Sequence, residues 1–167
     1  IIRHPEAANP TQNELISFQE ILDLVKESLA TEITQTKTEI KSDFSSLAKI
    51  PFPRVYLQSI IYNLVSNAIK YRSPDRIPVI KLTSYCRGDQ YFFACQDNGL
   101  GIDLKKYGHK IFELYSTFHH HKNSRGVGLH ITKNQLEARG GNIRVESQVN
   151  QGSTFIVNFG DIIGLAT

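Results

Sequence analysis

Residues Leu57 to Arg72 read LQSIIYNLVSNAIKYR and predict an amphipathic helix at the centre of this chain. Apolar residues recur along it with the three- and four-residue spacing of a helix that is buried on one side. The members of this apolar stripe are Leu57, Ile60, Ile61, Leu64, Val65, Ala68 and Ile69. Because such a stripe by itself predicts only a core helix, we expect the other elements to pack around this segment.

A second face of the same predicted helix carries Asn63, Asn67, Lys70 and Tyr71. Asparagine is unfavourable inside a helix, so two asparagines one turn apart suggest a role beyond helix formation. A carboxamide oxygen is a neutral ligand suited to Mg²⁺, and a lysine ammonium is a point charge suited to phosphate. The helix alone leaves two interpretations open, a metal–phosphate site and a solvated surface.

Composition indicates one globular domain and excludes several function classes. The chain has 167 residues, of which 40% are hydrophobic and 21% charged, and its formal net charge is +3. Lysines and arginines are dispersed, which argues against a nucleic-acid partner and fits a small anionic ligand equally well. No apolar run reaches the ~20 residues that a membrane span needs, so we expect no direct membrane contact. Because the chain starts at Ile1 without a signal-peptide pattern, we expect a piece of a longer protein.

The predicted domain runs from residue 17 to residue 160, after a linker or frayed start at 1–16 and before a tail at 161–167. Ser17 is expected to cap a first helix that ends near Ala30. Five apolar residues form the predicted buried face of that helix, namely Phe18, Ile21, Leu22, Val25 and Leu29.

The order of the predicted elements indicates the fold class. After the first helix we expect a strand at Thr36–Phe44, the central helix, strands at Val79–Cys86 and Tyr91–Gln96, a long polar segment at 103–125, a helix opened by residues 125–129 and ended by Gly140-Gly141, and strands at Asn142–Val149 and Ser153–Phe159. This order predicts an α/β (α+β) two-layer sandwich, in which helices cover one face of a mixed, largely antiparallel sheet.

The two cysteines lie on the two predicted strands that flank Gly88-Asp89. With a two-residue turn there, Cys86 faces Tyr91 and Cys95 faces Leu82, which separates the thiols by about 13 Å along the ladder. We therefore expect no disulfide, and free thiols suit a reducing cytoplasm.

Two glycine-containing motifs follow strands or precede helices. In Asp97-Asn98-Gly99-Leu100-Gly101, the glycines permit close backbone approach or positive φ, and Asp97 can accept a hydrogen bond; an ordinary glycine turn explains the pattern as well. Gly126 and Gly128 precede a predicted helix, where backbone amides can approach an anion.

The long polar segment between the motifs is predicted to be a lid. Its run His119–His121 fits a solvated lid better than a metal site, because adjacent histidines do not easily converge on one tetrahedral centre.

Taken together, four separated motifs resemble the catalytic, ATP-binding domain of bacterial sensor histidine kinases, which has the Bergerat nucleotide-binding fold. The resemblance spans about Ser17 to Phe159. Its motifs are an N box at Asn63–Tyr71, a first glycine box at Asp97–Gly101, an F box around Lys110–Tyr115 and a second glycine box at Gly126–Leu129. The family usually has another glycine two positions before Gly126, where this chain has Ser124.

The resemblance implies a site for ATP and Mg²⁺. Asn67, with Asn63, would hold the metal, and Lys70 would neutralise phosphate charge, so that Asn63 and Lys70 are the predicted catalytic residues. Tyr71 would flank the adenine, and Asp97 would accept from its exocyclic amine. Gly99 and Gly101 would make room for the base, while Gly126 and Gly128 would present amides to phosphate. The full set of further predicted nucleotide-binding residues is Gly99, Gly101, Ile102, Lys110, Arg125, Gly126, Val127, Gly128 and Leu129.

The activity that the resemblance implies is transfer of the γ-phosphoryl group of ATP to a histidine in a separate dimerisation domain. A response regulator receiver domain would be the second partner. The domain would lie in the cytoplasm, and this location also allows a parent protein that is anchored in a membrane. Two alternatives stay open, a nucleotide-sensing module without catalysis and a Bergerat-type ATPase. Phe112 has two interpretations as well, docking of the acceptor domain or anchoring of the lid.

Overall fold

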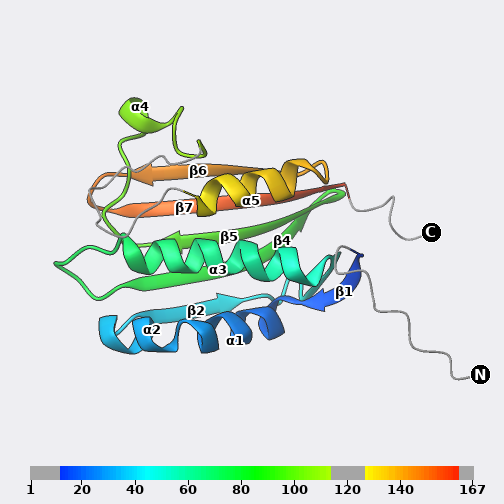
Figure 1. Ribbon diagram of the computed structural model, residues 1–167, viewed down its shortest axis with the longest axis horizontal. Helices are drawn as coiled ribbons and strands as arrows, with labels where there is room; N and C mark the ends of the chain where they lie inside the picture. The colour runs from blue at the N-terminus through cyan, green and yellow to red at the C-terminus, as the bar shows by residue number, and fades with distance from the viewer. Residues whose placement is uncertain (1–11, 114–126, 162–167) are drawn as a thin grey trace, which may run out of the picture.

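Five strands form the main sheet of the computed structural model, which describes residues 12–113 and 127–161 (Figure 1). In chain order they are β2 (Glu39–Asp43), β4 (Val79–Arg87), β5 (Gln90–Asp97), β6 (Asn142–Gln148) and β7 (Gly152–Asp161). Their order across the sheet is β2-β4-β5-β7-β6, in which only β2 and β4 pair in parallel. The predicted mixed, largely antiparallel sheet is confirmed.

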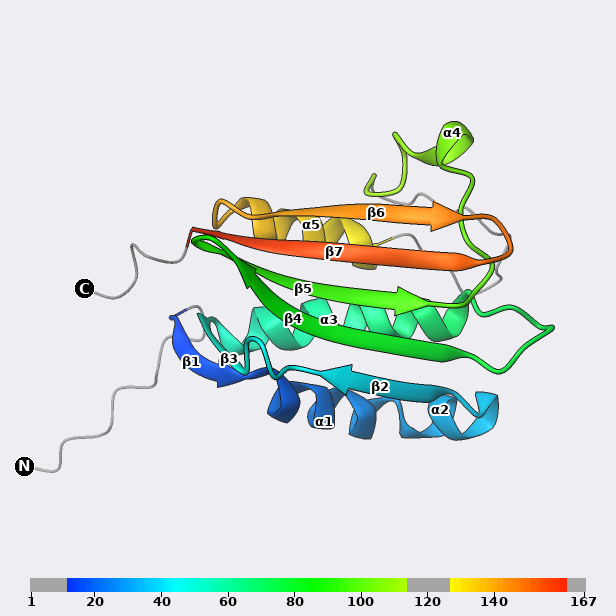
Figure 2. The ribbon, with the colours of Figure 1, turned by 180° about the vertical axis from the view of Figure 1, so that it is seen from behind.

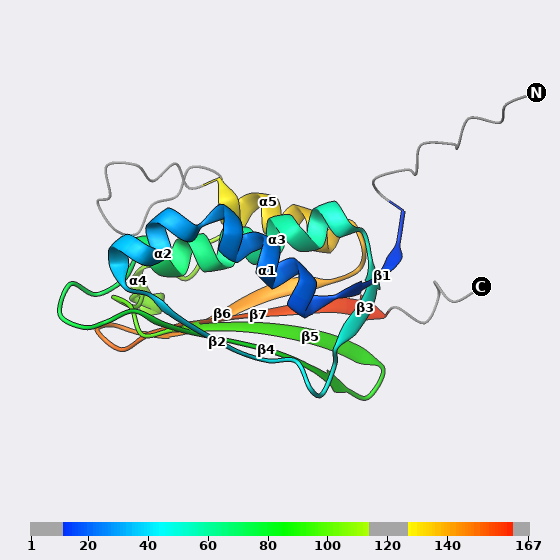
Figure 3. The ribbon, with the colours of Figure 1, turned by 90° about the horizontal axis from the view of Figure 1, so that it is seen from below.

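Helices cover one face of this sheet, as the view from below shows (Figure 3). They are α1 (Phe18–Ser28), α2 (Ala30–Thr36), α3 (Arg54–Lys70) and α5 (Gly128–Glu137), and a short α4 (Leu104–Tyr107) follows β5. A separate antiparallel ribbon of β1 (Glu14–Ser17) and β3 (Lys49–Phe52) lies at one end of the molecule (Figure 2). The predicted two-layer α/β sandwich is therefore confirmed.

The central helix α3 buries the face that its sequence predicts. All seven residues of the apolar stripe are buried. The helix begins at Arg54, three residues before the predicted start, because Pro53 has an extended ψ and a φ of −66° and so leads directly into it. Its last residue is Lys70, and Tyr71 is the C-cap.

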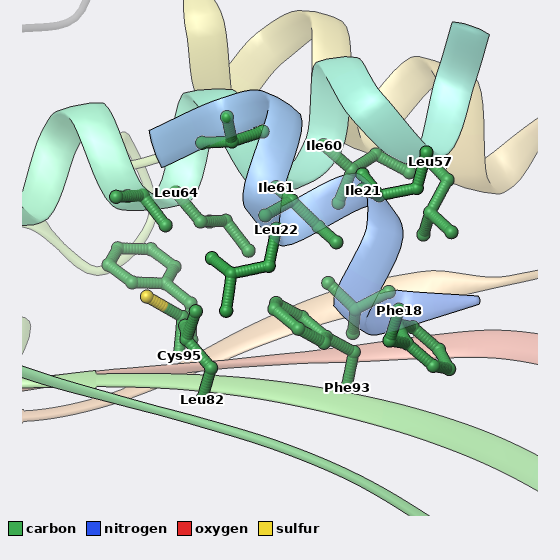
Figure 4. Close-up of a cluster of buried hydrophobic side chains, with 14 of the residues drawn as sticks. Phe18, Ile21, Leu22, Leu57, Ile60, Ile61, Leu64, Leu82, Phe93 and Cys95 are labelled. Carbon is green, nitrogen blue, oxygen red and sulfur yellow. The ribbon is translucent and has the colours of Figure 1, made fainter. Parts of the chain in front are cut away.

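Helix α1 packs beside α3 and completes the core. The Ser17 hydroxyl caps it by accepting a hydrogen bond from the Glu20 amide at 3.3 Å, and all five residues of its predicted face are buried. Figure 4 shows side chains of α1 and α3 pointing toward sheet residues such as Phe93. The rings of Phe18 and Phe93 stack with centroids 5.8 Å apart. Each such fully buried side chain contributes about 1.5–3 kcal/mol, so this interface fixes where the remaining faces of α3 lie.

Two parts of the predicted N-terminal half differ in the structure. The strand predicted at Thr36–Phe44 is confined to Glu39–Asp43, because the chain continues as helix α2 and turns at Lys37, whose φ is 56°. Leu29 and Ile33 explain this helix, since they lie one turn apart and both pack against the core. Residues 14–16, placed by the sequence in the linker, pair with β3.

Both predicted hairpins form, the first at the predicted turn and the second with its turn one residue earlier than predicted. Arg87 pairs with Gln90, so Gly88-Asp89 is a two-residue turn in which Gly88 has a φ of 59°. The predicted register is confirmed, since Cys86 faces Tyr91 and Cys95 faces Leu82, and both cysteines are free. Burial raises the pKa of the Cys95 thiol. The second hairpin turns through residues 149–151, between Gln148 and Gly152.

None of the helices within the described ranges has the length and apolar character needed to cross a lipid bilayer.

Candidate functional site

The polar face of α3 lies beside its core stripe and carries the residues expected to bind a ligand. Asn63, Asn67 and Lys70 are half-buried along it, and Tyr71 follows at the helix end. The Asn63 side-chain nitrogen donates to the Gly128 carbonyl at 3.2 Å and to the Thr132 hydroxyl at 3.3 Å. Within the described part of the chain, the Asn67 side chain has no hydrogen-bond partner, so its amide oxygen is available to a ligand.

The end of α3 is joined directly to the first glycine box. The Tyr71 carbonyl accepts a hydrogen bond from the Leu100 amide at 3.0 Å. The Lys70 ammonium lies 5.9 Å from the centroid of the Tyr71 ring, so cation and ring occupy the same end of the helix. The N box and the first glycine box, separated in the sequence, are therefore one unit in space.

Asp97 ends β5 and organises the first glycine box with one of its two carboxylate oxygens. Its Oδ1 accepts from the Gly99 amide at 2.8 Å and from the Ser153 amide at 3.2 Å. Burial raises the pKa of the Asp97 carboxyl, while these two amide donors and the charge of Arg76 act in the opposite direction. Among the described residues, none donates a hydrogen bond to Oδ2. That oxygen remains available as an acceptor in a half-buried position.

The glycines of this box are required by close backbone packing. A Cβ on Gly99 would lie 2.6 Å from the Tyr71 carbonyl oxygen, and one on Gly101 would lie 2.0 Å from the Gln148 carbonyl oxygen. Gly101 also has a φ of 69°, which side-chain-bearing residues rarely adopt. The space that a side chain would need is thus taken by the protein's own backbone, whereas the family resemblance implied that it makes room for a base.

Buried Ile102 continues the box and is held by β6. Its amide donates to the Ser147 hydroxyl at 2.8 Å, and that hydroxyl lies 2.9 Å from the Gly152 carbonyl, to which it donates. The first glycine box is therefore fixed on three sides, by α3, by β6 and by the start of β7.

Arg76 is a residue of this site that the sequence analysis missed. Its Nε donates to the Asn98 carbonyl at 2.5 Å, and its Nη2 donates to the Gly99 and Asn150 carbonyls, both at 2.7 Å. The guanidinium thus ties the first glycine box to the β6–β7 turn. Nothing in the local sequence predicts this, because the three carbonyls carry no side-chain signal and one of them is 74 residues away.

Replacing Arg76 with Gln should weaken ATP binding about tenfold, because the loss of charge-assisted hydrogen bonds to three carbonyls would cost roughly 1–2 kcal/mol and loosen the loop around Asp97. Calorimetry on the purified variant measures the effect. Arg87→Gln is the matched control, since it removes the same charge from a hairpin end where Arg87 lies against Tyr85. Equal affinities in the two variants would contradict the role given to Arg76.

The segment after the first glycine box is anchored to the domain as far as it is described. Ile111 is buried, and the Phe112 ring meets Phe155 edge-on with centroids 6.4 Å apart. The Phe112 carbonyl lies 3.2 Å from Nδ1 of His130 on α5. Of the two interpretations of Phe112, the structure shows the anchor. Lys110 is exposed in the turn after α4.

The remaining predicted lid residues, including His119–His121, Ser124, Arg125 and Gly126, lie outside the described residues. Val127 is the N-cap of α5, Gly128 is its first residue, and Leu129 packs against the core. A Cβ on Gly128 would lie 3.3 Å from Oδ1 of Asn63, so the second glycine box meets the N box.

Thr132 is a second residue that the sequence analysis missed. The apolar Ile131 is 39% exposed, and the buried residues of α5 are Thr132 and Leu136. The spacing of residues 129, 132 and 136 is the signal that could have identified it, because it follows one helix face.

The donor atoms of this site fit a nucleotide that is bound together with a divalent cation. No group of three His, Cys, Asp or Glu side chains that could hold a metal occurs among the described residues. The available donors are the neutral amide oxygens of Asn63 and Asn67, which suit Mg²⁺ when phosphate oxygens supply the remaining ligands.

The comparisons with known proteins place this fold and site in a class. Residues 53–161 match the family described as "Histidine kinase-, DNA gyrase B-, and HSP90-like ATPase". Because the match covers more than half of the 167 residues, the chain belongs to this ATPase family. Within the family, it is a homologue of the catalytic domains of sensor histidine kinases, which confirms the resemblance found in the sequence.

Individual relatives support this assignment. Phytochrome-like protein Cph1 of Synechocystis is 31% identical over 150 residues, which cover 87% of this chain and 20% of that protein. Cyanobacterial phytochrome A of Nostoc is 32% identical over 156 residues, covering 89% of this chain and 20% of that protein. The chain thus spans about a fifth of the length of these curated relatives.

Solved structures share the fold. The catalytic domain of histidine kinase ThkA has a TM-score of 0.76 at 22% identity, with 90% of this chain and 96% of that chain covered. Full-length ShkA, solved in complex with AMPPNP, has a TM-score of 0.75 at 24% identity, with 91% of this chain and 32% of that chain covered.

Proposed function

We propose that this chain is an ATP-binding catalytic domain that transfers the γ-phosphoryl group of ATP to a histidine of a separate dimerisation domain. The observation that carries the proposal is the convergence of three kinds of group, namely the free acceptor oxygen of Asp97, the amides of Asn63 and Asn67, and the Lys70 cation. These three kinds of group suit, in that order, the adenine base, a metal-bound triphosphate and the negative charge of its phosphates. Membership of the ATPase family supports the proposal.

The adenine end of the site would be built on Asp97. Its Oδ1 is already used by the Gly99 and Ser153 amides, so Oδ2 would accept from the exocyclic amine of the base. The half-buried Tyr71 ring would flank the base, since its backbone is fixed next to the first glycine box. Arg76 and the packed glycines would hold this pocket in shape without touching the nucleotide.

The phosphate end would be built on α3 and the start of α5. Asn63 and Asn67 would hold Mg²⁺ through their amide oxygens, and Lys70 would neutralise phosphate charge. When bound, the metal would supply charge neutralisation on the transferring phosphoryl group. The backbone amides at the start of the ten-residue helix α5 would face the same phosphates. The chain's own contribution is thus positioning and charge balance.

Transfer to histidine suits these residues better than hydrolysis of ATP. Water attack needs a general base, and the amide of Asn63 cannot accept a proton for that purpose. We place the acceptor histidine in a dimerisation domain of the same parent protein and the next acceptor in a response regulator receiver domain. Histidine kinase ThkA has been solved in complex with the response regulator protein TrrA, which supports the second partner by analogy of fold. The two free cysteines suit a reducing, cytoplasmic location.

Asp97→Asn tests the adenine assignment. The variant should bind ATP about ten- to a hundredfold more weakly, at a cost of about 1–3 kcal/mol. If the new amide nitrogen takes the place of Oδ2, it opposes the adenine amine. If it takes the place of Oδ1, it opposes the Gly99 and Ser153 amide donors. Calorimetry with ATP, and with GTP as the control base, measures it. An unchanged preference for ATP in the folded variant would remove Asp97 from the base site.

The transfer itself is tested with the parent protein and ATP that is radiolabelled in the γ position. The expected product is protein-bound label that is lost in acid and stable in alkali, as a phosphohistidine is. ATP binding without any such label would favour the nucleotide-sensing alternative, and release of inorganic phosphate without labelled protein would favour the ATPase alternative.

A further inference from the structure

Thr132 and Asn63 form a small hydrogen-bonded unit between α5 and α3. Thr132 is fully buried, and its hydroxyl donates to the Gly128 carbonyl one turn earlier at 3.0 Å. The Asn63 side-chain nitrogen donates to that same carbonyl at 3.2 Å and to the Thr132 hydroxyl oxygen at 3.3 Å. The unit joins two helices whose residues are 65 to 69 positions apart in the sequence.

The protons available in this unit allow only one orientation of the Asn63 amide. The Gly128 carbonyl has no proton, and the single proton of the Thr132 hydroxyl is committed to that carbonyl. Both atoms can therefore only accept from Asn63, and the NH₂ end must face them. If the amide were turned over, its oxygen would oppose the Gly128 carbonyl oxygen with no proton between them, which is unfavourable in a half-buried place.

The same geometry leaves the amide oxygen accessible. Oδ1 of Asn63 accepts no hydrogen bond from the described residues. It lies beside Gly128, where a Cβ would come within 3.3 Å, so the absence of a side chain there keeps the space at Oδ1 open. A neutral oxygen with a fixed direction and open space is suited to a hard cation.

We propose that Thr132 is a positioning residue that fixes the Asn63 amide with its oxygen toward the Mg²⁺ of bound Mg·ATP. The inference rests on the proposed function and deepens it, since it names what orients one metal ligand. Without the hydroxyl, one of the two acceptors of the NH₂ group is lost, and the Gly128 carbonyl alone is left to hold the amide, so its direction is less well fixed. Groups that orient a metal ligand are commonly worth ten- to a hundredfold in metal affinity.

The experiment compares Thr132→Val, which keeps the shape and removes the hydroxyl, with Thr132→Ser, which keeps the hydroxyl. Calorimetry gives the ATP affinity of each variant with Mg²⁺ and with EDTA, and thermal unfolding checks the fold. We expect the gain in affinity from Mg²⁺ to fall about tenfold in Thr132→Val and to stay near the parent value in Thr132→Ser. The affinity in EDTA should change little in either variant, which a general structural role of Thr132 would not produce.

Two results separate the inference from the proposed function. An unchanged Mg²⁺ gain in Thr132→Val, with the gain lost in Asn63→Ala, would overturn the role of Thr132 and leave the proposed function in place. Absence of Mg²⁺-dependent ATP binding in the parent chain would overturn the proposed function and this inference with it.

A measurement on the parent chain decides the matter if Thr132→Val does not fold. The side-chain NH₂ protons of Asn63 should exchange slowly with solvent in NMR spectra, both before and after addition of Mg·ATP, because Nδ2 keeps its two acceptors while Oδ1 takes the metal. Fast exchange in the free chain, or a loss of protection on adding Mg·ATP, would overturn the inference.

Discussion

Asn67→Ala should lower the affinity for Mg·ATP by about a hundredfold, or nearly 3 kcal/mol at 1.4 kcal/mol per factor of ten. Asn67 lies one turn after Asn63 on the polar face of α3, and its side chain has no hydrogen-bond partner among the described residues. Its removal would therefore withdraw a metal ligand without breaking an internal contact. Alanine is also the better helix former, so the free energy of unfolding should hold or rise slightly.

The measurement is calorimetry with ATP in Mg²⁺ and in EDTA, together with urea unfolding. Asn134→Ala is the control, because Asn134 is an exposed asparagine in α5 whose side chain forms a hydrogen bond with His130 on its own helix. The control should bind Mg·ATP like the parent. A folded Asn67→Ala variant with parent affinity in Mg²⁺ would remove the metal-binding assignment of the N box.

Gly101→Ala should destabilise the fold by more than about 3 kcal/mol, a value typical of severe packing defects. The new Cβ would lie 2.0 Å from the Gln148 carbonyl oxygen and 3.0 Å from the Val149 Cα, so one of the two backbone segments must move. The φ of 69° at Gly101 adds a conformational cost of roughly 1–2 kcal/mol for any residue with a Cβ. The displacement would also separate the first glycine box from the end of β6.

Gly88→Ala is a matched control for this substitution. Gly88 has a similar φ of 59°, but a Cβ there meets nothing within 4 Å. It should therefore lose only the conformational cost of about 1–2 kcal/mol. Urea unfolding of both variants gives the difference, which measures the backbone contact alone. Equal stabilities of the two variants would show that the end of β6 can move away from the new Cβ with little loss in the free energy of unfolding.

Much of the fold could be predicted from the sequence because the relevant signals are local. The apolar stripes of α1 and α3 follow helical periodicity, and every predicted member of both stripes is buried. The Ser17 cap and the Gly88-Asp89 turn depend on residues within three positions of one another, and both form as predicted. The helix α2 was missed because Lys37, which turns the chain at its end, is not a residue type that signals a left-handed turn.

The sequence by itself determined the residue types of the candidate site and their order, because motif spacing along the chain carries that information. Only the tertiary structure decided how they work together. Arg76 reaches the Asn150 carbonyl across 74 residues, and Asn63 reaches Gly128 across 65. It also decided why Gly99 and Gly101 are glycines, since the atoms that a Cβ would strike include the backbone carbonyls of Tyr71, the C-cap of α3, and of Gln148 in β6. Backbone carbonyls look the same at every position of a sequence, so their hydrogen bonds and close contacts exist only once the chain has folded.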